Sequence, residues 1–314
     1  MNAFQSIFAE RLASYVVLRR QLGLRFEGQE TMLHAFDRFV HERDHHGPLS
    51  EQLARDFALS VIDPTTTVPA RRYLVVRHFA EYLATYDPNT PRLDPKAILR
   101  SRQQPPPYIF SEQEIEHLLG QATEFPQRHP VSNVSLRTMI GLAASTGLRP
   151  GEVVGLDQAD VDLDSGILII HHTKLNKDRV VPVHPTTLEV LRVYASERDQ
   201  IPGADIEQAF FLNGRGCRYH TDNLNYLIGR LVRSIDLHPP CGKMPTFRSL
   251  RHTFAVRRLV AWYRTGENVQ ALLPALATYM GHVHYTSTAY YLTATAELLG
   301  VAADRLFTLE ASHE

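Results

Sequence analysis

Two short motifs of this 314-residue chain place an arginine beside a turn or at the start of a helix. Residues 144–156 read ASTGLRPGEVVGL and contain Arg149. Residues 247–255 read FRSLRHTFA and contain Arg248 and Arg251. A guanidinium offers forked donors that match phosphate oxygens, and it keeps its charge at any workable pH. The motifs therefore indicate phosphate binding, although one arginine in a loop is most often a solvated surface residue.

Two lysines stand in a polar stretch between two β-rich runs, a pattern that predicts a hairpin. The motif of residues 173–183 reads TKLNKDRVVPV and contains Lys174 and Lys177. A lysine ammonium can donate a proton to a leaving oxygen, and its pKa shifts readily beside other cations. Either lysine suits that chemistry, although each one read alone is an ordinary turn residue.

A histidine and two tyrosines form a fourth motif closer to the C-terminus. Residues 279–291 read YMGHVHYTSTAYY, and His282 precedes Tyr291 by nine positions. On a helix the neighbouring Tyr290 would point about 100° away from Tyr291, so only one of them can face a given phosphate. A lone tyrosine on a helix is far more often part of a core or an interface than a nucleophile.

In their order and flanking residues, the four motifs resemble those of the tyrosine recombinases and phage-type integrases. The resemblance is strong over residues 108–300, whereas over residues 1–104 it is only architectural. It implies these catalytic residues, to which we add Arg248 on its own chemistry: Arg149, Lys174, Arg251, His282 and Tyr291. Lys177 competes with Lys174 for the family's hairpin lysine. Glu152 is expected to orient neighbouring groups, with a plain surface carboxylate as the equal alternative.

One position departs from the family pattern. Arg248 stands where the His-x-x-Arg-His motif of the family usually has its first histidine. Arginine donates hydrogen bonds and carries charge, but it does not accept a proton, so a proton-accepting role at this position is in doubt. We expect Arg248 to be a third phosphate donor; the alternative is a helix-surface cation.

The resemblance also implies a mechanism. Tyr291 would attack a DNA phosphate in line, giving a 3′-phosphotyrosine and a free 5′ hydroxyl, while arginines stabilise the growing charge and Lys174 protonates the departing oxygen. No metal, ATP or other cofactor is expected, because the phosphotyrosine keeps the bond energy. The implied assembly is a homo-tetramer on a double-stranded DNA recombination site, alone or with other recombinases of the same mobile element.

Four helices are predicted near the N-terminus from apolar positions at three- and four-residue spacing. Their approximate ranges are 4–22, 28–45, 50–62 and 68–86. We expect a SAM-like, four-helix core-binding domain over residues 1–90, which the resemblance implies grips the duplex. Proline-rich residues 91–107 predict a linker, and its cations could follow phosphates or belong to a solvated spacer.

Residues 108–314 predict an α+β catalytic domain, so the whole fold is expected to be mainly α with one small sheet. Ser111 and Glu114 have capping-box spacing, which starts a helix. Strands are expected at 166–172 and 179–183, and further helices at 135–146, 186–200, 221–235, 247–264 and 269–280. Apolar residues within 296–309 predict a helix that docks on a neighbouring protomer.

Charge and composition restrict the partners. The net charge is −1, but residues 211–258 hold nine lysines and arginines against two aspartates, enough to attract a polyanion locally. There is no apolar run near twenty residues and no secretory leader pattern, so we expect no membrane and a cytoplasmic protein. Two distant cysteines and histidines without HExxH spacing give no indication of metal.

Two rival functions remain open at this point. A type IB-like topoisomerase would use the same chemistry to relax supercoils. A catalytically reduced, DNA-binding accessory protein of a mobile element would bind without cutting, with Arg248 as a sign of decay. Covalent trapping on nicked DNA separates an active enzyme from a binder.

Overall fold

The computed structural model divides into two compact units, residues 1–104 and 105–314, and each has its own apolar core. The residues that the structure describes are 3–24, 26–63, 66–98, 107–125, 130–171, 178–201, 207–235, 237, 239, 244–282, 288, 291 and 300. Within them, no helix is long and apolar enough to cross a membrane.

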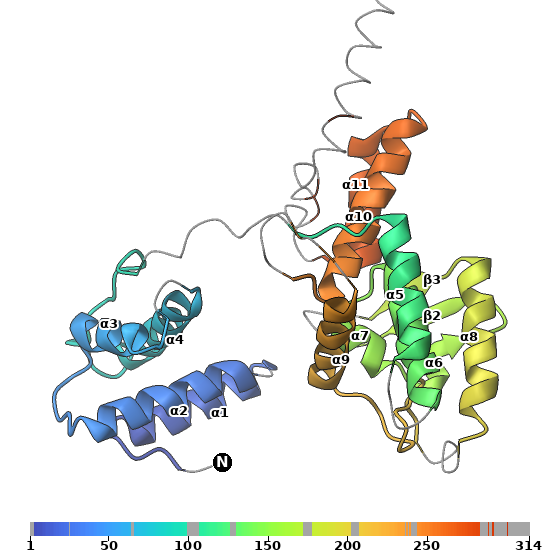
Figure 1. Cartoon of the computed structure of the whole chain (residues 1–314). Coiled ribbons are helices and arrows are strands. Elements are labelled where there is room, and N and C mark those ends of the chain that lie inside the picture. Colours follow the sequence, from blue (N-terminus) through green and yellow to red (C-terminus); the bar gives the residue numbers. More distant parts are fainter. Residues whose placement is uncertain are drawn as a thin grey trace, which may run out of the picture. The chain divides into compact units, whose positions relative to one another are not determined.

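Helices build the described part of the N-terminal unit (Figure 1). They are α1 (Ala9–Gln21), α2 (Glu27–Glu42), α3 (Glu51–Leu59) and α4 (Val68–Leu83). Helix α4 contacts the other three, because its apolar residues fall on more than one side. Phe36, Phe57 and Phe79 are almost fully buried between the helices, and the ring of Phe36 meets that of Phe57 edge-on.

The segment expected to begin the linker packs instead on the N-terminal core over residues 91–98. Leu93 is buried there, and Ala97 and Ile98 pack against the same cluster of side chains. Prolines end the helical pattern, but they do not prevent the apolar residues between them from being buried. Residues 91–98 are therefore attached to the N-terminal unit through these side chains, and the extent of the linker stays a prediction.

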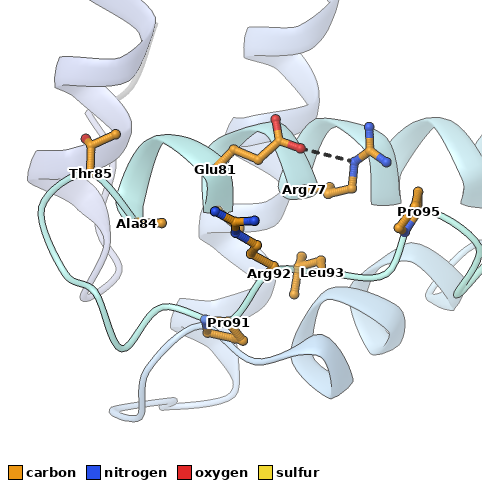
Figure 2. A pocket seen from close by; sticks show the side chains of 9 residues that line it. Arg77, Glu81, Ala84, Thr85, Pro91, Arg92, Leu93 and Pro95 are labelled. Carbon is orange, nitrogen blue, oxygen red and sulfur yellow. Dashed lines mark ion pairs between the residues drawn. The ribbon is translucent and has the colours of Figure 1, made fainter.

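A hollow of about 560 Å³ lies where this segment passes the C-terminal half of α4 (Figure 2). Arg77 and Glu81 form an ion pair on its wall, with 3.6 Å between Nε and Oε1. Arg92, which belongs to the segment after α4, lines the same hollow.

The C-terminal unit contains the remaining elements and the fourth motif's residues. Its helices are α5 (Glu112–Glu124), α6 (Pro130–Thr146), α7 (Pro150–Gly155), the 3-10 turn η1 (Gln158–Asp160), α8 (Pro185–Arg198), α9 (Thr221–Ser234), α10 (Phe247–Arg264) and α11 (Val269–Met280). Its strands are β1 (Val161–Asp162), β2 (Ile167–Ile170) and β3 (Arg179–Pro182).

Helix α6 is the central element of this unit, with contacts to α5, α8 and α10 (Figure 1). The sheet has the order β1-β2-β3 with both pairs antiparallel, and Ile170 pairs with Arg179. Leu168, Ile170 and Val181 point from the sheet into the same core as α6. The prediction of a mainly helical fold with one small sheet is confirmed.

Helices α10 and α11 pack together around a further cluster of buried side chains. Phe254 and Leu259 from α10 meet Leu273 and Met280 from α11, and the ring of Tyr291 belongs to the same cluster. The motif residues on α10 and at the end of α11 are therefore held by a common apolar core.

Candidate active site

The turn between α6 and α7 presents the first motif arginine. Gly147 has φ +67°, a left-handed conformation that favours glycine. A Cβ at this position would lie 2.6 Å from Cδ1 of Phe254, so the missing side chain also lets the turn approach α10 closely. Arg149 is the N-cap of α7, and Pro150 fills the first helical position as its fixed φ favours.

Arg251 on α10 is 2% exposed and connects three parts of the site. Its Nη1 donates to the carbonyl oxygen of Gly147 at 2.6 Å, and its Nη2 donates to that of Met280 at 2.6 Å. The planar fork of the guanidinium suits two acceptors in fixed directions. Arg251 thereby fixes the α6–α7 turn and the end of α11 relative to α10.

Arg149 also contacts the C-terminal end of α11. Its Nη2 donates to the carbonyl oxygen of Gly281 at 2.7 Å, and its Nη1 donates to Oε1 of Glu152 at 2.5 Å. Gly281 ends α11 with φ +65°, and a Cβ there would lie 2.8 Å from Nη1 of Arg179. Arg149 and Arg179 therefore contact the end of α11 together with Arg251.

Glu152 holds these two guanidinium groups together. Arg179 donates from Nη1 to Oε1 at 3.0 Å and from Nη2 to Oε2 at 2.8 Å, and its Nε donates to the carbonyl oxygen of Tyr279 at 3.0 Å. The side chains of Arg179 and Glu152 are 10% and 11% exposed. Burial raises the pKa of Glu152, but the hydrogen bonds and charge of Arg179, together with Arg149, outweigh it and lower the pKa to about 2. The carboxylate is thus ionised at neutral pH.

Tyr291 lies near the guanidinium groups of Arg149, Arg248 and Arg251, and it is 3% exposed. Its hydroxyl oxygen is 3.0 Å from Nδ1 of His252, and the charge of Arg251 acts on it. Burial raises the pKa of the phenol, while the charges of Arg251, Arg248 and Arg149 partly offset that rise. The hydroxyl is therefore protonated at neutral pH and surrounded by groups that would stabilise its anion.

His282 follows the end of α11 and faces the tyrosine ring. Its Nδ1 is 2.7 Å from Oγ1 of Thr288, and its ring stacks on that of Tyr291 with the centroids 6.2 Å apart. Burial, followed by the charges of Arg251 and Arg149, lowers the pKa of His282 to about 3. At neutral pH His282 is an uncharged imidazole.

The arginines also act on each other. Burial and the charge of Arg149 lower the pKa of Arg251 to about 10, so it keeps its proton at neutral pH. Like charges in a site of low water content repel, and an anion placed among them relieves the repulsion. The charges of Arg149 and Arg251 are therefore suited to binding an anion such as a phosphate group.

The structure brings together most of the residues that the motifs indicated. Arg149, Glu152, Arg251, His282 and Tyr291 make the contacts given above. Arg248 is exposed on α10, yet its charge lowers the pKa of His252 and His282, so it lies near them. Lys174, Lys177, Tyr290 and the segment 296–309, apart from Gly300, lie outside the described residues.

Three residues of the site were not singled out from the sequence. Arg179 shares the inward face of β3 with Val181, because alternate residues of a strand point to the same side. His252 lies one helical turn after Arg248 and therefore on the same side of α10. These two periodicities were visible in the sequence, whereas the contact of Thr288 with His282 depends on tertiary structure.

Replacing Glu152 with Gln is expected to destabilise the C-terminal unit by about 3 kcal/mol at neutral pH, since it leaves Arg179 buried without its counter-charge. Because folding lowers the pKa of Glu152 from 4.5 to about 2, its contribution is present above pH 4.5 and is lost as the pH falls toward 2. The difference between variant and wild type should shrink below pH 4.5.

Urea unfolding followed by the fluorescence of Trp262, the single tryptophan, which lies in α10, measures this difference. Glu189→Gln is the matched control, because Glu189 pairs with Arg192 on the exposed side of α8 and should contribute less than about 1 kcal/mol. Equal stability of Glu152→Gln and wild type at neutral pH would contradict the assigned contact.

Comparison with known proteins shows the family of this chain. Residues 109–297 match the model of the phage integrase family. A Sinorhizobium fredii (strain NBRC 101917 / NGR234) protein designated integrase/recombinase y4rE is 43% identical over 98% of this chain and 98% of its own length. Tyrosine recombinase XerD of Ralstonia nicotianae (strain ATCC BAA-1114 / GMI1000) is 29% identical over 82% of this chain and 76% of its own.

The fold agrees as well. The integrase of transposon Tn1549, solved with transposon right end DNA, covers 94% of this chain and 99% of its own with a TM-score of 0.66 and 18% identity. The XerH recombinase, solved with its difH substrate after cleavage, covers 87% and 77% with a TM-score of 0.65 and 17% identity. The chain belongs to the phage integrase family, whose tyrosine recombinases are enzymes that break and rejoin DNA.

Proposed function

We propose that this protein is a site-specific DNA recombinase that cuts and rejoins strands through a 3′-phosphotyrosine at Tyr291. The observation that carries the proposal is the position of the Tyr291 hydroxyl, on which the charges of Arg251, Arg248 and Arg149 all act. A phosphodiester is protected by its own negative charge, and fixed cations remove that protection where charge grows in the transition state.

Each arginine has a separate part in the proposal. Arg251 and Arg149 donate to the nonbridging oxygens of the phosphate, in directions fixed by their bonds to the backbone at Gly147, Met280 and Gly281. Arg248, exposed on the same helix as Arg251, adds a third donor from the side open to DNA. Glu152 keeps Arg149 in place and prevents the cations from separating.

The remaining groups handle orientation and protons. Lys174 gives a proton to the departing 5′ oxygen; in support, it comes five residues before Arg179, which lies at the site. Lys177 is the competing donor. His282, neutral and held by Thr288, donates a hydrogen bond to the phosphate or assists proton transfer. The reaction needs neither metal nor ATP, since the phosphotyrosine stores the energy for rejoining.

The substrate is double-stranded DNA, and four protomers on two duplexes supply the four cuts that an exchange requires. Residues 1–104 form the unit that grips the duplex together with the catalytic unit, and residues 296–309 dock on the next protomer. Similarity to the Tn1549 integrase favours a mobile-element enzyme, working alone or with other recombinases of its element.

A covalent selection from random DNA sequences tests the proposal and identifies the recombination site in the same experiment. Wild-type protein is incubated with a library of duplexes that carry a randomised central segment and a nick at a series of positions. A cut beside a nick releases a short fragment, and the enzyme then stays covalently attached to the DNA because the strand cannot be rejoined. We expect complexes that survive boiling in detergent and share a sequence. The released fragment should carry a free 5′ hydroxyl that polynucleotide kinase labels directly.

Two other outcomes would replace the proposal. DNA binding in a mobility-shift assay without any detergent-resistant complex would make the protein an accessory binder. Covalent complexes without a shared sequence, together with relaxation of supercoiled plasmid by a monomer, would favour a topoisomerase.

A further inference from the structure

The tyrosine hydroxyl must lose a proton when it attacks, and the group that receives this proton is the subject of a second proposal, which rests on the proposed function. Burial raises the pKa of Tyr291, so an unaided phenol would rarely be ionised at neutral pH. A positioned base within hydrogen-bond distance of the phenol oxygen removes this difficulty.

Most groups near the hydroxyl cannot be that base. Arg248 and Arg251 donate protons and do not accept them. Both oxygens of Glu152 accept hydrogen bonds from Arg149 and Arg179, and its pKa of about 2 makes it a poor acceptor. Nδ1 of His282 is 2.7 Å from Oγ1 of Thr288 and its ring stacks on that of Tyr291, so His252 is the histidine with a ring nitrogen at hydrogen-bond distance from the hydroxyl.

His252 has the required geometry. Its Nδ1 lies 3.0 Å from the hydroxyl oxygen of Tyr291, and the two rings are 5.5 Å apart and tilted. It extends from α10 one turn after Arg248 and next to Arg251, and it is partly buried. The groups that face it are Arg248 and Arg251 from its own helix and Tyr291 across the contact.

We propose that His252 is the general base of the cleavage step. In the neutral imidazole Nε2 carries the proton, and Nδ1 accepts the proton of the Tyr291 hydroxyl. The phenol oxygen forms its bond to phosphorus, the bond from phosphorus to the 5′ oxygen breaks, and that oxygen takes a proton from the general acid. On rejoining, the imidazolium returns its proton to the departing phenol oxygen.

The charge state of His252 supports this role. Burial, followed by the charges of Arg248 and Arg251, lowers the pKa of His252 to about 4, so its imidazole is neutral at neutral pH and can accept a proton. The neighbouring cations also keep the imidazolium acidic, which favours return of the proton during rejoining. The assignment explains how the site works with Arg248 at a position where the family usually has histidine.

The test measures single-turnover cleavage of the DNA recovered in the selection described above, by wild type and His252→Gln. Loss of a general base should slow cleavage by about 10²–10⁴-fold. The wild-type rate should be flat between about pH 6 and 9, while the variant rate should rise roughly tenfold per pH unit, since only the phenolate then attacks. His117→Gln, exposed on α5, is the matched control and should behave as wild type.

A second measurement separates chemistry from structure. Tyr291 is replaced by 2,3,5-trifluorotyrosine, whose phenol ionises at lower pH and needs less help from a base. This residue should restore most of the rate lost in His252→Gln, whereas a merely structural defect would persist. If wild type cleaves and His252→Gln retains its rate and flat profile, or if the fluorinated residue gives no rescue, the role of His252 is refuted while the proposed function stands. If wild type itself forms no covalent complex, the proposed function fails first.

Discussion

Tyr291→Phe is expected to abolish covalent trapping on the selected nicked DNA, with a loss on the order of 10⁴-fold or more. The substitution removes the single oxygen that attacks phosphorus and keeps the ring, which is buried among α10 and α11 side chains. His252 loses a hydrogen-bond partner, so a stability loss of about 1 kcal/mol is expected and the fold should persist. Detergent-resistant complexes measured over time give the rate.

The neighbouring Tyr290→Phe is the matched control, since it removes the same atom one residue earlier in the chain. It should trap at the wild-type rate, and both variants should bind the DNA within a few-fold of wild type. Trapping by Tyr291→Phe together with loss of trapping by Tyr290→Phe would transfer the nucleophile to the other residue and contradict the site described above.

Arg251→Lys is expected to lower the cleavage rate by about 10²–10³-fold while the protein still binds DNA. The substitution keeps the positive charge, so a defect of this size would be due to the lost geometry of the guanidinium group. A lysine ammonium cannot reproduce the planar fork that donates to the carbonyl oxygens of Gly147 and Met280. We also expect a lower urea midpoint for the C-terminal unit, because the carbonyl oxygens of Gly147 and Met280 lose donors.

Arg192→Lys provides the comparison for this second prediction. Arg192 donates to the carbonyl oxygen of Leu163 from an exposed place on α8, so the same exchange should leave cleavage and stability nearly unchanged. A cleavage rate for Arg251→Lys within a few-fold of wild type would mean that charge alone matters and that the fixed orientation of Arg251 does not.

Most of the fold could be predicted because helical periodicity in this chain is strong and its breaks are marked. Helix α10 spans the predicted residues 247–264 and α11 the predicted 269–280. The capping box of Ser111 and Glu114 begins α5 as expected. The two-residue strand β1 escaped prediction, because so short a segment has no periodicity and is defined only by its pairing with β2.

The candidate site was predictable where a residue's neighbours in the sequence identify it. Arg149, Arg251, His282 and Tyr291 stand in motifs with a recognisable order, and they meet in the fold. Arg179 was overlooked because its partner Glu152 is 27 residues away in the sequence. Until that partner is known, an arginine on a strand is interpreted as a surface cation.

The position of Leu93 was also not predicted. Prolines on either side indicated a spacer, but burial of one leucine against α4 attaches residues 91–98 to the N-terminal unit. Local composition describes what a segment cannot become, in this case a helix, and leaves open what it packs against.

The attachment of DNA to one tyrosine is the central claim, and peptide mapping measures it most directly. Wild-type protein trapped on the selected DNA is digested with nuclease and protease, and the modified peptide is sequenced by mass spectrometry. We predict a nucleotide joined through its 3′ phosphate to Tyr291. A nucleotide on another residue, or one joined through its 5′ phosphate, would contradict the account.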